Sequence, residues 1–206
     1  MKKILLSGFE PFDKSPINPS QELLNALPDE LFGDVTLVKI ILPVDQAHAP
    51  DLLIAKIVEQ QPDAVIALGQ ASGRSRICLE RVALNLMDFR IPDNKGISIA
   101  DQPVIAGGPA AYFSTLPLRE IEAALLAEGI PVELSLSAGA YLCNQVFFRM
   151  IHEIAIRQMA IYAGFIHLPA LPEQAAREEK PLPSMSLDML KRAIHLVIAV
   201  IMNTHS

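Results

Sequence analysis

The sequence contains two cysteines, Cys78 and Cys143, and the second has the setting of a nucleophile. Cys143 lies in SAGAYLCNQVFF, residues 137–148, where a buried helix is expected to begin. Unpaired N–H groups and the helix dipole at such a position favour the thiolate, the reactive form of cysteine. The alternative is a small core residue, because free cysteine is among the most buried residue types. Cys78 falls inside an expected strand, and we expect it to pack there.

A base for such a thiol would be a histidine, and His167 has the most suitable position. It ends the apolar stretch MAIYAGFIH, residues 159–167, which is typical of a buried strand. A cysteine and a histidine at two strand ends can meet although they are distant in sequence; the alternative is a core or surface histidine. The remaining histidines have weaker claims, because three lie on or beside expected helices and one in the tail: His48, His152, His195 and His205.

Glu80 is an unusual carboxylate, because it stands on the apolar face of an expected strand. Burying an isolated carboxylate is costly, so Glu80 needs a partner. One alternative is an ion pair with Arg74, Arg76 or Arg90. The other is the orienting acid of a Cys-His-Glu triad, which holds one imidazole nitrogen while the other faces the thiol. Alternation in ICLERVALNLM, residues 77–87, puts Glu80 on one face with Cys78, Val82, Leu84 and Leu86.

Further residues near strand ends could shape a ligand site. GQASGR, residues 69–74, lacks the G-x-x-x-x-G-K-[ST] pattern and the third glycine of G-x-G-x-x-G, so we do not expect nucleotide binding. Gln70 in this segment offers an amide donor and acceptor to a neutral polar ligand. Phe9 and Phe12 flank Glu10-Pro11 in the first loop, where they form either a lid on the core or a ligand wall.

The elements that must position these residues alternate between strands and helices. This alternation predicts an α/β domain with a mainly parallel, covered sheet, whose site lies beyond the carboxyl ends of the strands. Asn18 and Pro19 are typical of a helix start, and Gly129 of a helix end. We expect strands over 2–8, 35–42, 63–69, 77–87, 131–137 and 159–167, helices from 19, over 49–60, 118–129 and 140–158 and from 186 to about 202, a turn over 89–96, irregular chain over 97–115 and a loop over 168–184.

Composition and charge disfavour several classes of protein. The 206 residues fit one domain, 1–206, and their formal net charge of −6 without a basic run disfavours a nucleic-acid partner. The cysteines and histidines show no zinc-site spacing, and two cysteines make no disulfide framework. No apolar run reaches the roughly 18 residues of a membrane span, and the N-terminus does not resemble a signal peptide. We therefore expect a cytoplasmic protein that does not bind membranes.

Four segments together resemble the pyroglutamyl peptidase I family, also called pyrrolidone-carboxylate peptidases. The likeness keeps the order and spacing of the segments and runs from residue 1 to about residue 200. Four separate segments make this resemblance highly specific. The segments are SGFEPF with Asn18-Pro19-Ser20, GQASGRSRICLERVALNLMDFRIPDN, SAGAYLCNQVFF and GFIHLPALPEQ.

The resemblance implies a cysteine peptidase that removes the N-terminal pyroglutamyl (5-oxoproline) residue from peptides through a thioester acyl-enzyme. It also implies a three-layer α/β/α sandwich with a mainly parallel, mixed sheet, commonly assembled as a homotetramer, with no metal or cofactor. Arg90 falls where the family places an arginine beside the reacting carbonyl. The family's catalytic triad falls on Glu80, Cys143 and His167, and its pyroglutamyl pocket on Phe9, Phe12, Gln70 and Tyr141.

The sequence departs from the family pattern at three places. Asp13-Lys14 follow the first loop's Pro-Phe where glycines are usual, and Ser72 stands where glycine is typical. Tyr141 stands where phenylalanine is common. We expect these differences to change loop conformation and pocket polarity, and with them rate and affinity, more than the type of reaction.

Two other functions fit part of the pattern. Glutamine amidotransferase-like hydrolases also combine Cys, His and Glu, but they place the cysteine on a G-x-C-x-G elbow, and AYLCN has no flanking glycines. A protein that only binds a small metabolite would leave Cys143 and Glu80 idle. An unreactive Cys143 would favour this second alternative.

Overall fold

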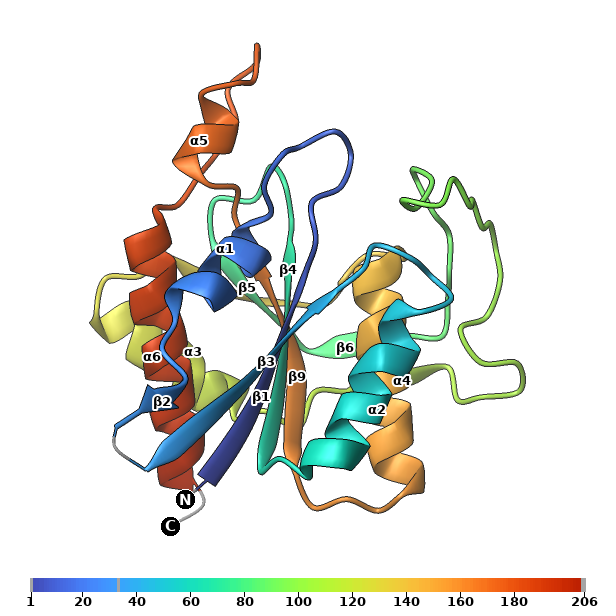
Figure 1. Cartoon of the computed structure of the whole chain (residues 1–206), viewed down its shortest axis with the longest axis horizontal. Helices are drawn as coiled ribbons and strands as arrows, with labels where there is room; N and C mark the ends of the chain where they lie inside the picture. The colour runs from blue at the N-terminus through green and yellow to red at the C-terminus, as the bar shows by residue number, and fades with distance from the viewer. Residues whose placement is uncertain (1, 33, 205–206) are drawn as a thin grey trace.

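The computed structural model describes residues 2–32 and 34–204, and a seven-stranded sheet forms the centre of this part of the chain. Figure 1 shows the sheet running through the middle of the molecule with helices on either side. Its strand order is β2-β3-β1-β4-β9-β5-β8. The strands are β1 (Lys2–Phe9), β2 (Glu30–Leu31), β3 (Val35–Leu42), β4 (Ala64–Gln70), β5 (Ile77–Glu80), β8 (Val132–Ser135) and β9 (Tyr162–Leu168).

The sheet is mainly parallel but mixed, as expected. β3, β1, β4 and β9 run parallel to one another, whereas β5 pairs antiparallel with β9, and β2 antiparallel with β3. β8 returns to a parallel pairing with β5. The antiparallel register sets Cys78 opposite His167 and Glu80 opposite Phe165. Glu80 therefore lies beside β9, opposite the residue two positions before His167.

Helices cover both faces of the sheet and complete the three-layer α/β/α arrangement (Figure 1). One layer contains α1 (Pro19–Ala26), α3 (Leu118–Ala127) and α6 (Leu187–Thr204), and the other α2 (Ala49–Gln60) and α4 (Leu142–Ile156). Their apolar residues form two separate cores, one against each face. In β1, for example, Ile4 and Leu6 face the first core and Leu5 the second, as burial on both faces requires.

Helix ends follow the local sequence signals. Asn18 is the N-cap of α1, where its side chain accepts a hydrogen bond from the Ser20 N–H, and Pro19 follows it. Gly129, with φ +69°, ends α3 in a Schellman motif. In this motif the Gly129 and Ile130 N–H groups donate to the carbonyls of Leu126 and Leu125. The predicted start of α1 and end of α3 are therefore confirmed within a residue or two.

The strand expected over 77–87 is wrong in one respect, because the chain leaves the main sheet at Arg81. Its N–H donates to the Ser135 carbonyl and its own carbonyl accepts from the Ser114 N–H, so Arg81 links two sheets. β6 (Val82–Leu84) then pairs with β7 (Ala111–Phe113) in a separate two-stranded sheet. The apolar face expected to run from Cys78 to Leu86 therefore ends at Glu80.

Two segments expected to be irregular contain short elements. The range 97–115 holds β7, and Met87 and Gln102 form an isolated β-bridge. The proline-rich loop over 168–184 holds α5 (Pro172–Ala175), a single turn that projects at the top of Figure 1. Both elements are too short for a hydrophobic period to reveal them in the sequence.

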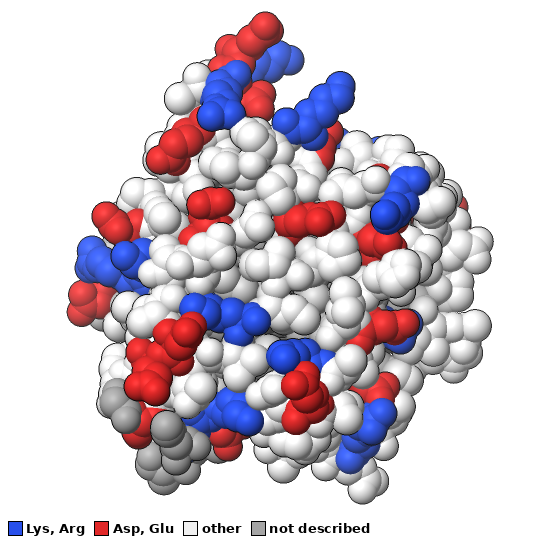
Figure 2. Space-filling model, viewed as in Figure 1, with Lys and Arg blue, Asp and Glu red and all other residues white. Residues whose placement is uncertain are grey.

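Charged side chains of both signs are spread over the surface. Figure 2 shows acidic and basic side chains interspersed over the viewed face rather than gathered by sign. No described helix combines the length and apolarity that crossing a bilayer requires. The first and last described segments meet away from the carboxyl ends of the strands, where Lys2 Nζ donates to the Met202 carbonyl at 3.2 Å (Figure 1).

Candidate active site

Cys143 lies at the N-terminus of α4, as predicted. Tyr141 is the N-cap residue and supplies no side-chain cap, so the first N–H groups of the helix are left to other partners. The sulfur lies against the backbone of Gly69 near the end of β4. A Cβ atom on Gly69 would lie 2.9 Å from Cys143 Sγ and 2.8 Å from Phe165 Cζ, so only glycine leaves room for the thiol here.

His167 lies next to this thiol because β4 and β9 are parallel neighbours. Their register pairs Gly69 with His167, and the imidazole is buried, with 4% of the residue exposed. Nδ1 lies 2.8 Å from Glu80 Oε1, which leaves Nε2 available to the Cys143 thiol. The structure thus brings together the three residues expected to form the triad.

Charge around His167 outweighs its burial. Burial lowers the pKa of the imidazole, but the Cys143 thiolate, through its charge and a hydrogen bond, and then Glu80 raise that pKa to about 9. The imidazole is therefore protonated at neutral pH when it is paired with the thiolate. The Glu80 carboxylate supports the imidazole through Nδ1, on the side of the ring away from Nε2.

Glu80 has both of the partners that the sequence left as alternatives. Its Oε1 accepts from His167 and also from Arg74 Nη1 at 3.0 Å, and the carboxylate is fully buried. Arg74 also donates to the Ser137 carbonyl at 3.1 Å. Arg76 instead donates to the Val132 carbonyl at 3.4 Å. The ion pair and the orienting contact therefore coexist on one oxygen.

Cys78 lies in the core, as expected, and differs from Cys143 in its surroundings. Burial raises the pKa of the Cys78 thiol to about 11, although Arg74 opposes the shift. Its sulfur donates to Glu133 Oε1 at 3.3 Å. A thiol held protonated in this way is a poor nucleophile.

A cavity of about 410 Å³ opens in front of Cys143 and His167. Phe9 is buried and belongs both to the core and to the cavity wall. Phe12 is half-buried in the loop after β1. The cavity is lined by all five residues expected in the pocket: Phe9, Phe12, Gln70, Arg90 and Tyr141.

Similarity to known proteins identifies the family. A sequence model described as pyroglutamyl peptidase matches residues 2–204. The chain belongs to the pyroglutamyl peptidase family. This family consists of cysteine peptidases, so the predicted enzyme class is confirmed.

Several named relatives support the assignment. The pyrrolidone-carboxylate peptidase of Vibrio vulnificus is 45% identical over 99% of this chain and 94% of its own length. The protein of the same name from Thermococcus onnurineus is 46% identical over 95% and 96% of the two chains.

Solved structures agree. A variant of pyrrolidone carboxyl peptidase from Pyrococcus furiosus superposes with a TM-score of 0.95 at 40% identity, covering 99% of this chain and 100% of that one. Pyroglutamyl peptidase I from Bacillus amyloliquefaciens superposes with a TM-score of 0.92 at 38% identity, covering 97% and 94%. The predicted α/β/α fold is therefore confirmed.

Departures from the pyroglutamyl peptidase pattern now have structural counterparts. Asp13 and Lys14 have φ values of 51° and 62°, in the left-handed region that glycine adopts without strain. Ser72 Oγ accepts a hydrogen bond from Gln70 Nε2 at 2.9 Å. Gln70 Oε1 accepts from Gln174 Nε2 at 3.1 Å. The Gln70 amide, expected to offer both a donor and an acceptor to a ligand, is thus engaged at its oxygen and through one of its two N–H groups.

Tyr141 uses its hydroxyl outside the cavity. The hydroxyl donates to the Pro92 carbonyl at 3.1 Å, and the ring packs edge-on against Phe89 with centroids 4.8 Å apart. Burial, followed by the negative charges of Asp93, Cys143 and Asp13, raises the pKa of the phenol to about 12. The tyrosine therefore stays a neutral donor and ties α4 to the segment that bears Arg90.

The loop that carries Arg90 is fastened at several points. Asn94 Nδ2 donates to Glu10 Oε1 at 2.8 Å, and the same oxygen accepts the Val44 N–H at 3.0 Å. Asp93 Oδ2 accepts the Gln46 N–H at 3.1 Å. Arg90 itself is exposed at the cavity and has no ion-pair partner among the described residues. Its guanidinium is available to a ligand.

Sequence reasoning missed Asn144, which fixes the start of α4. Its Nδ2 donates to the carbonyls of Leu84 and Leu86 at 2.8 and 2.9 Å, and its Oδ1 accepts the Leu84 N–H at 2.8 Å. The neighbouring Cys143 is thereby held in place against β6. A polar residue in the buried first turn of an apolar helix was the available signal.

No group of three or more metal-ligating side chains occurs among residues 2–32 and 34–204.

Proposed function

We propose that Cys143, His167 and Glu80 carry out the removal of N-terminal pyroglutamyl residues, the reaction of the pyroglutamyl peptidase family to which the chain belongs. The observation that carries this assignment is His167, which is held between the Glu80 carboxylate and the Cys143 thiol. Cys143 then acts as the nucleophile, His167 as the proton carrier and Glu80 as the orienting acid.

The first half-reaction forms a thioester. The Cys143 thiolate adds to the carbonyl carbon of the pyroglutamyl amide, and the electron pair of the C=O bond moves to the oxygen. When this oxyanion collapses, the C–N bond breaks and the His167 imidazolium gives its proton to the departing amine. Glu80 keeps the imidazole in the orientation that this transfer needs.

The second half-reaction hydrolyses the thioester. Neutral His167 takes a proton from water, whose oxygen adds to the thioester carbonyl. Collapse breaks the C–S bond, releases pyroglutamic acid and restores the imidazolium–thiolate pair. These steps are complete without a metal ion or cofactor.

Two groups would stabilise the oxyanion in this mechanism. The Cys143 N–H lies in the first turn of α4, which has no side-chain cap. Arg90 adds a positive charge at the cavity.

Pocket composition accounts for specificity. The pyroglutamyl ring is small, flat and neutral, and Phe9, Phe12 and Tyr141 offer apolar walls for it. Gln70 offers a hydrogen bond to its amide group. A free N-terminal glutamate would bring charges that these walls do not pair, so it should be rejected.

We also propose that residues 1–206 form one peptidase domain that acts in the cytoplasm as a homo-oligomer, a tetramer. The single main sheet, built from strands between residues 2 and 168, supports one domain. The two free cysteines fit a reducing compartment. Exposed large apolar side chains, such as Phe113 and Leu136, fit buried interfaces between copies.

A pair of matched cysteine variants tests the nucleophile. Cys143→Ser should lower kcat/KM for a fluorogenic pyroglutamyl amide on the order of 10⁴-fold, because a serine hydroxyl is a weaker nucleophile than a thiol and is not ionised at neutral pH. Cys78→Ser, the control, should keep the rate constant of the folded enzyme. Near-native activity in Cys143→Ser would refute the assignment.

A further inference from the structure

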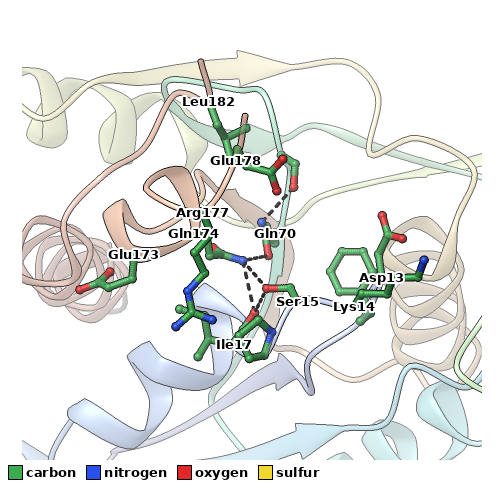
Figure 3. A pocket seen from close by; sticks show the side chains of 13 residues that line it. Asp13, Lys14, Ser15, Ile17, Gln70, Glu173, Gln174, Arg177, Glu178 and Leu182 are labelled. Atoms are coloured by element: carbon green, nitrogen blue, oxygen red, sulfur yellow. Dashed lines mark hydrogen bonds between the residues drawn. The ribbon is translucent and has the colours of Figure 1, made fainter. Parts of the chain in front are cut away.

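The side chain of Gln174 forms hydrogen bonds to several neighbouring segments, although it belongs to a short surface helix. It lies in α5, is 7% exposed, and lines a second cavity of about 490 Å³ that shares Phe12 and Gln70 with the candidate active site. Figure 3 shows its amide reaching Ser15, Ile17 and Gln70 from α5. One side chain therefore joins α5 to two segments that are distant in sequence, the loop after β1 and the end of β4.

Backbone groups determine which end of the Gln174 amide points where. The Leu171 N–H donates to Gln174 Oε1 at 2.9 Å. Gln174 Nε2 lies 3.2 Å from the Ile17 carbonyl, which can only accept. A reversed amide would set its NH₂ group against the Leu171 N–H and its oxygen against the Ile17 carbonyl. The NH₂ group of Gln174 therefore faces Gln70.

This orientation fixes Gln70 in turn. Its oxygen must face the NH₂ group of Gln174, and these atoms are 3.1 Å apart. The opposite orientation would bring two NH₂ groups together. The Gln70 NH₂ group is therefore turned to the other side, where one N–H donates to Ser72 Oγ at 2.9 Å. Its second N–H has no partner among the described residues and is left for a ligand in the cavity that holds Cys143 and His167.

We propose that Gln174 is a positioning residue that makes Gln70 a hydrogen-bond donor to the ring carbonyl of the pyroglutamyl group. This inference rests on the proposed function. Ser72 does not decide the orientation, because its hydroxyl can either donate or accept. Gln174, outside the pocket, thus selects a carbonyl oxygen on the substrate ring rather than the ring N–H as the partner of Gln70.

Two substitutions distinguish a Gln70 that donates a hydrogen bond to the substrate from a Gln70 that only links loops together. Gln174→Glu keeps an acceptor for the Leu171 N–H but presents a second acceptor to Gln70, which must reverse its amide. Gln70→Glu keeps an acceptor for Gln174 and for the Ser72 hydroxyl but has no N–H for the ring. Each variant should raise KM for a pyroglutamyl amide by about tenfold or more, with a smaller change in kcat. Thermal unfolding of both variants checks that the fold is kept, and Gln70→Glu suffices if Gln174→Glu does not fold.

Substrate analogues supply the readout that a structural role would not move. A 3-oxocyclopentanecarbonyl amide keeps the ring carbonyl but lacks the ring N–H, and a cyclopentanecarbonyl amide lacks both. Both variants should lose kcat/KM on the first analogue as they do on the pyroglutamyl amide. On the second analogue, which has no ring carbonyl, neither variant should have a lower kcat/KM than the unsubstituted enzyme. Equal losses on all three substrates, or an unchanged KM, would overturn the proposal. If the unsubstituted enzyme fails to hydrolyse the pyroglutamyl amide, the proposed function falls and the inference falls with it.

Discussion

At the scale of single residues, a buried carboxylate oxygen serves two cations. Glu80 Oε1 accepts from both His167 and Arg74, so the negative charge is shared between an orienting contact and an ion pair. Arg74 is one-third exposed, and its contribution to stability is correspondingly modest. Its role is to hold the Glu80 carboxylate in place beside the imidazole of His167.

The raised pKa of His167 predicts the alkaline limit of the reaction. The departing amine needs the imidazolium proton, so kcat/KM for a pyroglutamyl amide should fall as pH rises through about 9. The folded state holds this proton more tightly than a free histidine with a pKa of 6.5. The stabilisation of the folded state by this protonated histidine is therefore fully present below pH 6.5 and is lost as the pH rises through about 9.

A substrate with a good leaving group provides the control. The p-nitrophenyl ester of pyroglutamate expels a phenolate that needs no proton. Its rate should therefore not fall as the pH rises through about 9. Rates measured between about pH 6 and about pH 10 compare the two substrates. An amide profile that stays level through pH 9, or that matches the ester profile, would contradict the assignment of the proton to His167.

Residue types revealed the chemistry more readily than residue orientations. Cys143, His167 and Glu80 could be found because their types, and their places at strand or helix ends, are unusual. The orientation of the Gln70 amide could not be found, because it depends on Gln174, which is distant in sequence. The hydroxyl of Tyr141 likewise has its partner, the Pro92 carbonyl, in another loop.

At the scale of elements, the site depends on how closely α4 approaches β4. The first turn of α4 places the Cys143 sulfur against the backbone at Gly69. Asn144 fixes that turn through two hydrogen bonds to Leu84 in β6 and one to Leu86 just after it. The thiol position is therefore set by a strand on one side and by a short separate sheet on the other.

Gly69→Ala should displace the thiol. The added methyl group would lie 2.9 Å from Cys143 Sγ and 2.8 Å from Phe165 Cζ, so one of them must move. We expect kcat/KM to fall by about 10²-fold, because small shifts of reacting groups are costly, and the free energy of unfolding to fall by about 1–3 kcal/mol. Kinetics and denaturant unfolding of the purified variant measure both.

Gly164→Ala is the matched control in β9. A Cβ atom there would meet Ser114 and Leu116 rather than the thiol, so stability should fall while the rate constant of the folded enzyme is kept. Equal rate losses in the two variants would argue against a specific effect on Cys143. Full activity in Gly69→Ala would show that the close approach is not needed.

Long elements were predictable and short ones were not. β3 and α2 occupy the predicted ranges 35–42 and 49–60, because long apolar patterns and helix signals determine them. β6 and β7 have three residues each and depend on pairing between distant segments. The departure of the chain at Arg81 depends on its partners Ser135 and Ser114, which no local pattern announces.

At the scale of the whole molecule, the exposed apolar residues suggest where copies meet. Phe113 and Leu136 are 70% and 68% exposed. The residues next to them, Ser114 and Ser135, both bond to the backbone of Arg81, so the two side chains extend from adjoining backbone. We expect this surface, beside the β8 edge of the sheet, to lie in an interface of the proposed homo-oligomer.

Phe113→Asp should therefore reduce the sedimenting mass of the assembly, because it places a charge in an apolar interface. Phe32→Asp is the control, since Phe32 is also exposed, at 60%, but follows β2 at the opposite edge of the sheet. Sedimentation velocity of both variants and of the unsubstituted chain gives the comparison. A monomeric unsubstituted chain, or dissociation in Phe32→Asp alone, would contradict the expectation.

The contact between Lys2 and Met202 has a practical consequence. It brings the first and last described segments together near the amino end of β1, whereas the cavity lies beyond the carboxyl ends of β4 and β9. An affinity handle or a solid support attached at either end would therefore hang from the side away from the pocket (Figure 1). Immobilised in this way, the enzyme would present its substrate entrance to the passing solution.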